Sequence, residues 1–126
     1  MTDRVLGEMR RVASQSDPFF LWVHYYDPHE SKARRPRYHK LIGDFDRGFA
    51  RLIKELESTG ELDNTVVAVV SDHGEALGEH GHDSHATSLF DEQTRVPMVL
   101  WVPGLEARRI EQPVAAIDLT ATLAVL

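Results

Sequence analysis

The sequence predicts an α/β fold in which a mostly parallel sheet is flanked by helices. A long amphipathic pattern over residues 38–58 is typical of a helix. Three apolar runs, 19–26, 65–70 and 96–102, have the length and composition of buried strands. Helical patterns alternate with these runs along the chain, which is the order expected of α/β domains with parallel sheets.

Residues 3–14 are expected to form the first helix, with Thr2 or Asp3 as its cap. The dipeptide Asp17-Pro18 then ends the helical region, because a residue before proline is disfavoured there. The run 19–26 follows, and its continuous aromatic and aliphatic side chains predict a strand covered on both faces. The apolar positions of the helix share one face: Val5, Leu6, Met9, Val12 and Ala13.

Residues 27–37 carry two prolines and several charges, so they are expected to form a loop. The pattern over 38–58 predicts one apolar stripe over five turns of helix, closed by Gly60. The residues of the stripe are Tyr38, Leu41, Ile42, Phe45, Phe49, Leu52, Ile53 and Leu56.

The runs 65–70 and 96–102 are expected to be the second and third strands. Between them, residues 71–95 show little periodicity and form a long loop, which inside a compact domain usually serves a function. Residues 118–126 read as the beginning of a final helix.

The composition is that of a soluble globular protein of one domain: 126 residues, 42% hydrophobic, 27% charged, net charge −6. The acidic balance argues against nucleic acid as a partner. The basic run 32–37 is interpreted as a solvated turn in preference to a polyanion-binding patch, although it could hold an anionic substrate group.

The absence of cysteine excludes disulfides and thiolate metal sites. No apolar stretch is long enough for a membrane segment, and the N-terminus reads as an amphipathic helix rather than a signal peptide.

Two segments are expected to bring chemistry to the same rim of the sheet, because ligands bind beyond the carboxyl ends of parallel strands. One strand run leads into Asp27-Pro28-His29 and the next into Ser71-Asp72-His73-Gly74. The carboxylate of Asp72 and the imidazole of His73 are a reasonable half-shell for a divalent cation. Two ligands are too few for a closed site, so further ligands must come from elsewhere.

His80, His82 and His85 follow within the same loop, among several acidic residues. Taken singly, each would be a solvated loop histidine, but together beside Asp72 and His73 they favour a metal or an anion. Outside the loop, His24 is expected to be a satisfied core histidine and His39 a surface residue at the start of a helix.

The succession of motifs resembles the second half of a sulfatase catalytic domain in the alkaline-phosphatase superfamily. SDHGEALGEHG, followed by HDSHATSLFDEQTRVPMVLWVPG, carries the resemblance. FFLWVHYYDPHE is similar to the family's strand ending in a substrate-site histidine, and DNTVVAVVSDHG to its metal-binding strand. AAIDLTATLAVL is similar to its late D-x-x-P-T helix, with Ala121 at the proline position. The resemblance implies that residues 1–126 are a partial sulfatase catalytic domain, with the alkaline-phosphatase-like fold and without the N-terminal nucleophile-bearing portion.

The resemblance also implies roles for four residues. Asp72 and His73 match the pair that binds the divalent metal, calcium first, with manganese or zinc as alternatives. His29 matches the histidine that contacts sulfate or phosphate oxygens, and His85 a residue that touches the ester group. Both are therefore catalytic and substrate-binding candidates, with His85 as the general acid and His29 as the oxyanion contact, or the reverse. His80 and His82 have no family role and stay outside the predicted site.

The implied function is a metal-dependent sulfuric ester hydrolase that is inactive as this chain alone. The family's nucleophile lies in a C/S-x-P-x-R motif or is a lone Thr or Ser, and neither that motif nor an Asp-Asp pair occurs here. A phosphatase or a phosphoethanolamine- or glycerophosphate-type transferase of the same superfamily is one alternative, and a non-catalytic metal- or anion-binding half-domain is another. The expected partners are a sulfate- or phosphate-ester substrate and a second copy of the chain, held through its exposed half-domain face. Members of the family are often periplasmic or secreted.

Overall fold

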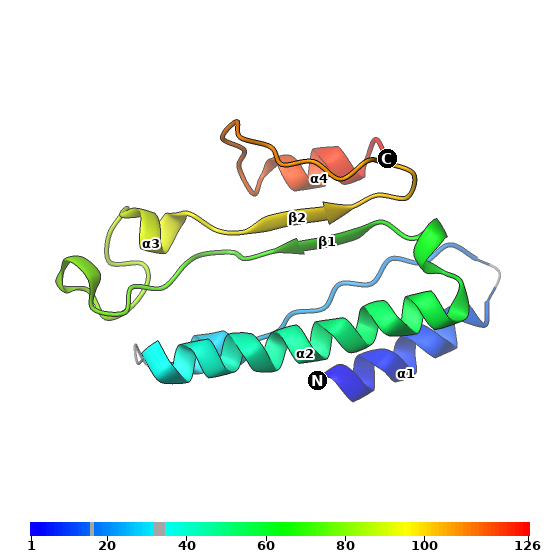
Figure 1. Ribbon diagram of the computed structural model, residues 1–126, viewed down its shortest axis with the longest axis horizontal. Helices are drawn as coiled ribbons and strands as arrows, with labels where there is room; N and C mark the ends of the chain where they lie inside the picture. Colours follow the sequence, from blue (N-terminus) through cyan, green and yellow to red (C-terminus); the bar gives the residue numbers. More distant parts are fainter. Residues whose placement is uncertain (16, 32–34) are drawn as a thin grey trace.

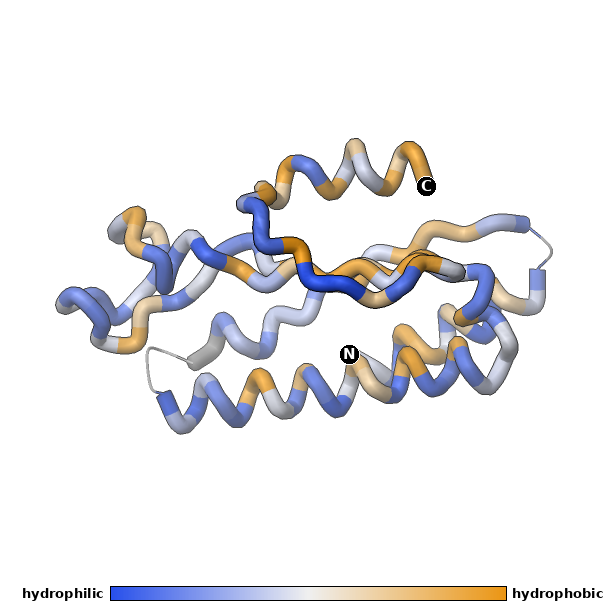
Figure 2. Tube along the Cα trace, turned by 45° about the horizontal axis from the view of Figure 1, so that its top comes forward, coloured by the Kyte–Doolittle hydropathy of each residue, from blue (hydrophilic) through white to orange (hydrophobic). Residues whose placement is uncertain are grey.

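The computed structural model describes residues 1–15, 17–31 and 35–126. The strand pair lies between α1 and α2 on one side and α4 on the other (Figure 1). Figure 2 turns the molecule by 45° and keeps this order, with hydrophilic and hydrophobic residues alternating along α2. In chain order the elements are α1 (Thr2–Ala13), the 3-10 turn η1 (Asp27–Ser31), α2 (Arg35–Thr59), η2 (Leu62–Asn64), β1 (Val67–Val70), η3 (Glu79–Gly81), α3 (Asp91–Thr94), β2 (Met98–Trp101) and α4 (Asp118–Leu123).

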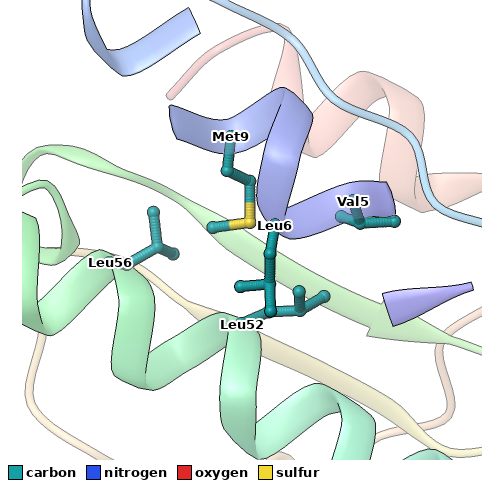
Figure 3. Packing of buried hydrophobic residues seen from close by; sticks show 5 residues of the cluster. All are labelled: Val5, Leu6, Met9, Leu52 and Leu56. Atoms are coloured by element: carbon teal, nitrogen blue, oxygen red, sulfur yellow. The ribbon is translucent and has the colours of Figure 1, made fainter. Parts of the chain in front are cut away.

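The hydrophobic core lies between α1 and α2, whose apolar side chains point toward one another (Figure 3). The predicted apolar faces are confirmed in part: three stripe residues of α1 and two of α2 supply the cluster, whereas Ile42 of the α2 stripe is 39% exposed. Val23, Tyr25, Leu62 and Val67 pack against its edge, which joins the helices to the rest of the chain. The buried members are Val5, Leu6 and Met9 of α1 and Leu52 and Leu56 of α2.

Two exposed ion pairs flank this core and connect α1 to α2. Arg10 donates two hydrogen bonds to the Glu55 carboxylate, at 2.6 and 2.8 Å, and these bonds lower the pKa of Glu55. Asp3 accepts a hydrogen bond of 2.6 Å from Arg51. The predicted cap is wrong, because Met1 occupies the N-cap position while the Thr2 hydroxyl lies 2.9 Å from that of Tyr25.

The sheet of the described residues has two strands, β1 and β2, and they run antiparallel. Val67 lies opposite Trp101 and Val70 opposite Met98, so the strands predicted at 65–70 and 96–102 both exist in shortened form. The mostly parallel sheet is not confirmed. A parallel pair needs a crossover connection, usually helical, whereas the chain between these strands contains only the short η3 and α3 and returns beside β1.

The apolar run 19–26 is extended but forms no strand, so this part of the prediction is wrong. Its side chains alternate in exposure from Trp22 onward: Val23 and Tyr25 pack on the core, whereas Trp22 is 81% exposed, and before it Phe20 is 84% and Leu21 39% exposed. The run is therefore covered on one face, and a strand additionally requires a hydrogen-bonded neighbour, which its own sequence does not specify. His24 is exposed along with Phe20 and Trp22, so its expected place in the core is wrong as well.

The predicted loop 27–37 is partly helical. Residues 27–31 form η1, and α2 begins at Arg35, three residues before its expected start, because proline is tolerated in the first turn of a helix. Gly60, at φ +75°, closes α2 as predicted, and His39 is exposed near its start. Of the basic run 32–37, residues 32–34 lie outside the described residues.

The long connection between the strands is tied together where α3 meets the turn that follows β1. The amide of Gly74 donates a 2.8 Å hydrogen bond to the carbonyl of Gln93. A Cβ at position 74 would lie 2.1 Å from the carbonyl oxygen of Glu92. Only glycine therefore permits this approach of the two backbone segments. No described helix combines the length and apolar character that crossing a membrane would require.

We expect Gly74→Ala to destabilise the protein by about 1–3 kcal/mol, because the added methyl group collides with backbone atoms that cannot rotate away. Urea denaturation followed by circular dichroism measures the change. The matched control is Gly43→Ala, in α2, where the new Cβ would meet only Arg47 Nη1 at 3.5 Å. The control should be neutral or more stable by up to about 1 kcal/mol. Equal stability of Gly74→Ala and the wild type would contradict the close approach.

Candidate functional site

Three histidines from distant parts of the chain come together beyond the last residue of β1. His73 follows β1, His85 lies in the connection to β2, and His29 lies in η1 at the same end of the molecule (Figure 1). The rings of His73 and His85 stack with their centroids 4.0 Å apart. The rings of His29 and His85 lie 5.1 Å apart, at 57°. The three histidines singled out from the sequence as site residues thus share one cluster.

Asp72 and His73 present two potential metal donors on the same side. Nδ1 of His73 lies 2.8 Å from the Gly74 carbonyl oxygen, which can only accept, so Nδ1–H is the donor and the neutral ring has its lone pair on Nε2. Oδ1 of Asp72 accepts the His73 amide at 3.0 Å, and Oδ2 lies 3.7 Å from Nε2. Two donors that share one ion lie at most about 4.2 Å apart for zinc and roughly 5 Å for calcium.

The donor pair therefore fits a shared divalent ion but does not enclose it. No three His, Asp or Glu side chains in the described ranges gather closely enough to hold a metal ion. The Asp72 carboxylate is 72% exposed, which leaves room for ligands from outside the described residues.

Glu75 belongs to the cluster although the sequence pattern gave it no role. Its carboxylate oxygens lie 3.2 and 3.3 Å from Nδ1 of His85, and its side chain is only 9% exposed. An Nδ1–H of His85 donates to this carboxylate, so Nε2 is the nitrogen left for other partners. The only signal in the sequence is the position of Glu75 directly after Asp72-His73-Gly74.

Two tyrosines complete the surroundings, and neither was predicted as a site residue. Tyr26 stacks on His29 with ring centroids 4.4 Å apart, and its hydroxyl lies 3.4 Å from His29 Nε2. Burial raises the pKa of Tyr38, at the start of α2, and the negative charge of Glu75 raises it further. Tyr26 thus covers one ring of the cluster, and Tyr38 lies close enough to Glu75 to be affected by its charge.

His80 has a structural role in the same loop. It adopts φ +52°, stacks on Phe90 at 3.9 Å, and its Nδ1 lies 2.8 Å from a Glu92 carboxylate oxygen. This hydrogen bond lowers the pKa of Glu92. Beside it, Glu79 forms an ion pair with Arg35, the described basic residue that begins α2. These contacts fold the loop and agree with leaving His80 outside the predicted site.

The arrangement combines an incomplete cation site with imidazoles that could face an anion. A carboxylate and an imidazole nitrogen point to one place, and two further imidazoles from other segments lie next to it. Cations and hydrogen-bond donors grouped in this way stabilise negative charge on a sulfate or phosphate ester.

Comparisons with known proteins agree with this chemistry. The family model described as Sulfatase matches residues 1–126. The uncharacterized sulfatase YidJ of Escherichia coli (strain K12) is 25% identical over 174 aligned residues, which cover 100% of this chain and 35% of YidJ. Choline-sulfatase of Rhizobium meliloti (strain 1021) is 35% identical over 101 residues, covering 79% of this chain and 20% of its own length.

Human iduronate 2-sulfatase is 37% identical over 73 residues, covering 58% of this chain and 13% of its own length. The chain thus spans about a third or less of the length of these relatives. No solved structure matches the chain. Because the family model matches along the whole chain and the relatives are sulfatases, the chain belongs to the sulfatase family of hydrolases.

Proposed function

We propose that this chain supplies the metal-binding and anion-contacting half of a sulfuric ester hydrolase site. The observation that carries the proposal is the convergence of His29, His73 and His85 beside Asp72 at the carboxyl end of β1. Three imidazoles and a carboxylate from three segments are more than the packing of an exposed loop requires. Membership of the sulfatase family selects sulfate esters as the substrate class.

Asp72 and His73 are the proposed ligands of a divalent cation, calcium first, with manganese or zinc as alternatives. The 3.7 Å separation of Oδ2 and Nε2 and the fixed tautomer of His73 support this role. When bound, such an ion stabilises negative charge on the oxygens of the ester. The ligands that complete its shell belong to other segments of a longer sulfatase domain.

His29 and His85 are the proposed catalytic and substrate-binding residues. One imidazole donates a hydrogen bond to a sulfate oxygen, and the other delivers a proton to the departing alkoxide, a contribution of ~10²–10⁴-fold in rate. His85 suits the second task, because Glu75 occupies its Nδ1 and leaves Nε2 available. His29, which contacts Tyr26, suits the first, and the two roles can be exchanged.

The nucleophile of the reaction is proposed to come from outside these 126 residues, which therefore form a partial catalytic domain. A formylglycine nucleophile is made from a Cys or Ser within a C/S-x-P-x-R motif. The chain contains no cysteine and no Ser-x-Pro-x-Arg sequence. In the longer domain, residues 19–26 are proposed to join a mostly parallel sheet, which would cover Phe20 and Trp22. Alone, the chain is expected to associate with itself through these exposed residues.

A phosphoryl-transfer enzyme of the same superfamily, either a phosphatase or a phosphoethanolamine- or glycerophosphate-type transferase, is the second candidate. His85 leaves this candidate open, because many sulfatases resemble the chain here but have lysine at this position. The missing nucleophile distinguishes the two, since a C/S-x-P-x-R motif indicates a sulfatase and a lone Thr or Ser indicates phosphoryl transfer.

One relative is described as an extracellular sulfatase, a Drosophila melanogaster SULF-1 homolog, which suggests a location outside the cytoplasm for the whole protein.

Calorimetric titration with calcium, manganese and zinc tests the cation site. We expect weak binding by the wild type, and a further loss of about tenfold or more in Asp72→Ala and in His73→Ala, because each removes one of only two donors. Asp83→Ala is the control, since this exposed carboxylate lies in the same loop and takes no part in the donor pair. Binding that is unaffected by both site variants would remove the metal assignment. Micromolar binding by the wild type would instead favour a non-catalytic metal-binding module.

Sulfate titration followed by NMR of the histidine rings tests the anion contacts. In the calcium-loaded chain, sulfate should shift the ring signals of His29 and His85 and leave those of His80 nearly unchanged, because Phe90 and Glu92 occupy that ring. Equal shifts for all three histidines would indicate non-specific binding and contradict the assignment. Repeating the titration with inorganic phosphate compares the two ester classes.

The isolated chain should not hydrolyse 4-nitrophenyl sulfate or bis(4-nitrophenyl) phosphate above the buffer rate, because it lacks the nucleophile. Release of 4-nitrophenolate measures both reactions. Robust turnover that persists in Asp72→Ala and His73→Ala would overturn both the partial-domain interpretation and the cation site.

A further inference from the structure

Gln93 is the one buried polar or charged residue in the part of the chain whose side chains are described, at 4% exposure. A buried amide is unfavourable unless its donor and acceptor atoms are hydrogen-bonded. Its Oε1 accepts hydrogen bonds from the amides of Thr87 and Ser88, at 3.1 and 3.2 Å. Its Nε2 donates to the Thr87 hydroxyl at 2.9 Å. The side chain thus holds the segment directly after His85.

The main chain of the same residue holds the other half of the site. The carbonyl of Gln93 accepts the 2.8 Å hydrogen bond from Gly74, which ends the turn that carries Asp72 and His73. One residue of α3 therefore binds the His73 turn through its backbone and the His85 loop through its side chain. These are the two segments whose histidine rings stack at 4.0 Å.

The backbone at Ala86, between His85 and Thr87, is strained and requires contacts that stabilise it. Ala86 adopts φ +58°, a left-handed conformation that is unfavourable for residues other than glycine. A strained residue persists only where the surrounding structure holds it in place. The side-chain amide of Gln93 binds the backbone of Thr87 and Ser88, the two residues that follow Ala86. On the other side, Gly74 approaches α3 too closely to accept a side chain.

We propose that Gln93 is a positioning residue of the site, which sets the distance between His85 and the Asp72-His73 pair. Its amide side chain keeps His85 stacked on His73, and its carbonyl keeps His73 in place. In this role Gln93 acts only through the two segments that it binds. The inference rests on the proposed function only in treating these residues as the site, since the hydrogen bonds stand without it.

The test is an NMR experiment on the full 126-residue chain, free of metal and substrate. The wild type should give nuclear Overhauser effects between the His73 and His85 rings. In Gln93→Met, which has a similar size but cannot bind the two amides, these effects should be lost while those between Leu6 and Leu52 in the core remain. Gln93→Glu retains an acceptor for both amides and should restore them. Thr94→Ala, the next residue of α3, is the matched control and should leave them unchanged.

Ring contacts that survive in Gln93→Met, or that are absent in the wild type, would overturn the proposal. If Gln93→Met does not fold, amide hydrogen exchange of the wild type decides instead. Thr87 and Ser88 should exchange slowly although they lie in a loop, and rapid exchange of both would overturn the proposal. The sulfate titration tests the proposed function separately. If the wild type shows the ring contacts but binds no sulfate, the proposed function is removed and the role of Gln93 remains.

Discussion

The hydrogen bond between the Gly74 amide and the Gln93 carbonyl is the contact on which the site depends. It closes the connection between β1 and β2, a segment with very little regular structure of its own. Long connections without such ties lose their conformation readily, because few of their backbone groups are paired within a helix or a ladder. Here the tie lies at the base of the connection, next to the end of β1, so the loop above it starts from a defined position. The histidine cluster is a consequence of that geometry.

Within this loop, three histidines have a carboxylate as a close neighbour. His80 pairs with Glu92 at 2.8 Å, His85 with Glu75 at 3.2 Å, and His73 faces Asp72 at 3.7 Å. The shortest of these pairs folds the loop, the second orients a ring of the site, and the widest leaves space for a further ligand. The acidic residues among the histidines are thus distributed over different tasks, which their density in the sequence does not reveal.

Patterns of local periodicity predicted much of the architecture. The faces of α1 and α2, the position of both strands and the helix-closing Gly60 follow from residues that are close in sequence. The direction of β2, the lack of a strand at 19–26 and the exposure of His24 depend on which segments become neighbours, and no local pattern contains that information. The site divides in the same way: the motif predicted His73 and His85, whereas Glu75 and Gln93 take their roles from contacts across the loop.

The alternating exposure of residues 19–26 has a consequence for the behaviour of the chain outside its native packing. The run FFLWVHYY contains no Asp, Glu, Lys, Arg or proline, and it is rich in aromatic side chains. Such segments assemble readily into cross-β ladders when they are left uncovered. Asp17-Pro18 and Asp27-Pro28 bracket the run at its two ends. Charges and prolines at such positions act as gatekeepers, because like charges stacked in a ladder repel one another and proline has no backbone N–H to donate. The same two dipeptides that delimit this segment in the fold therefore also limit how far an aggregate could grow along the chain.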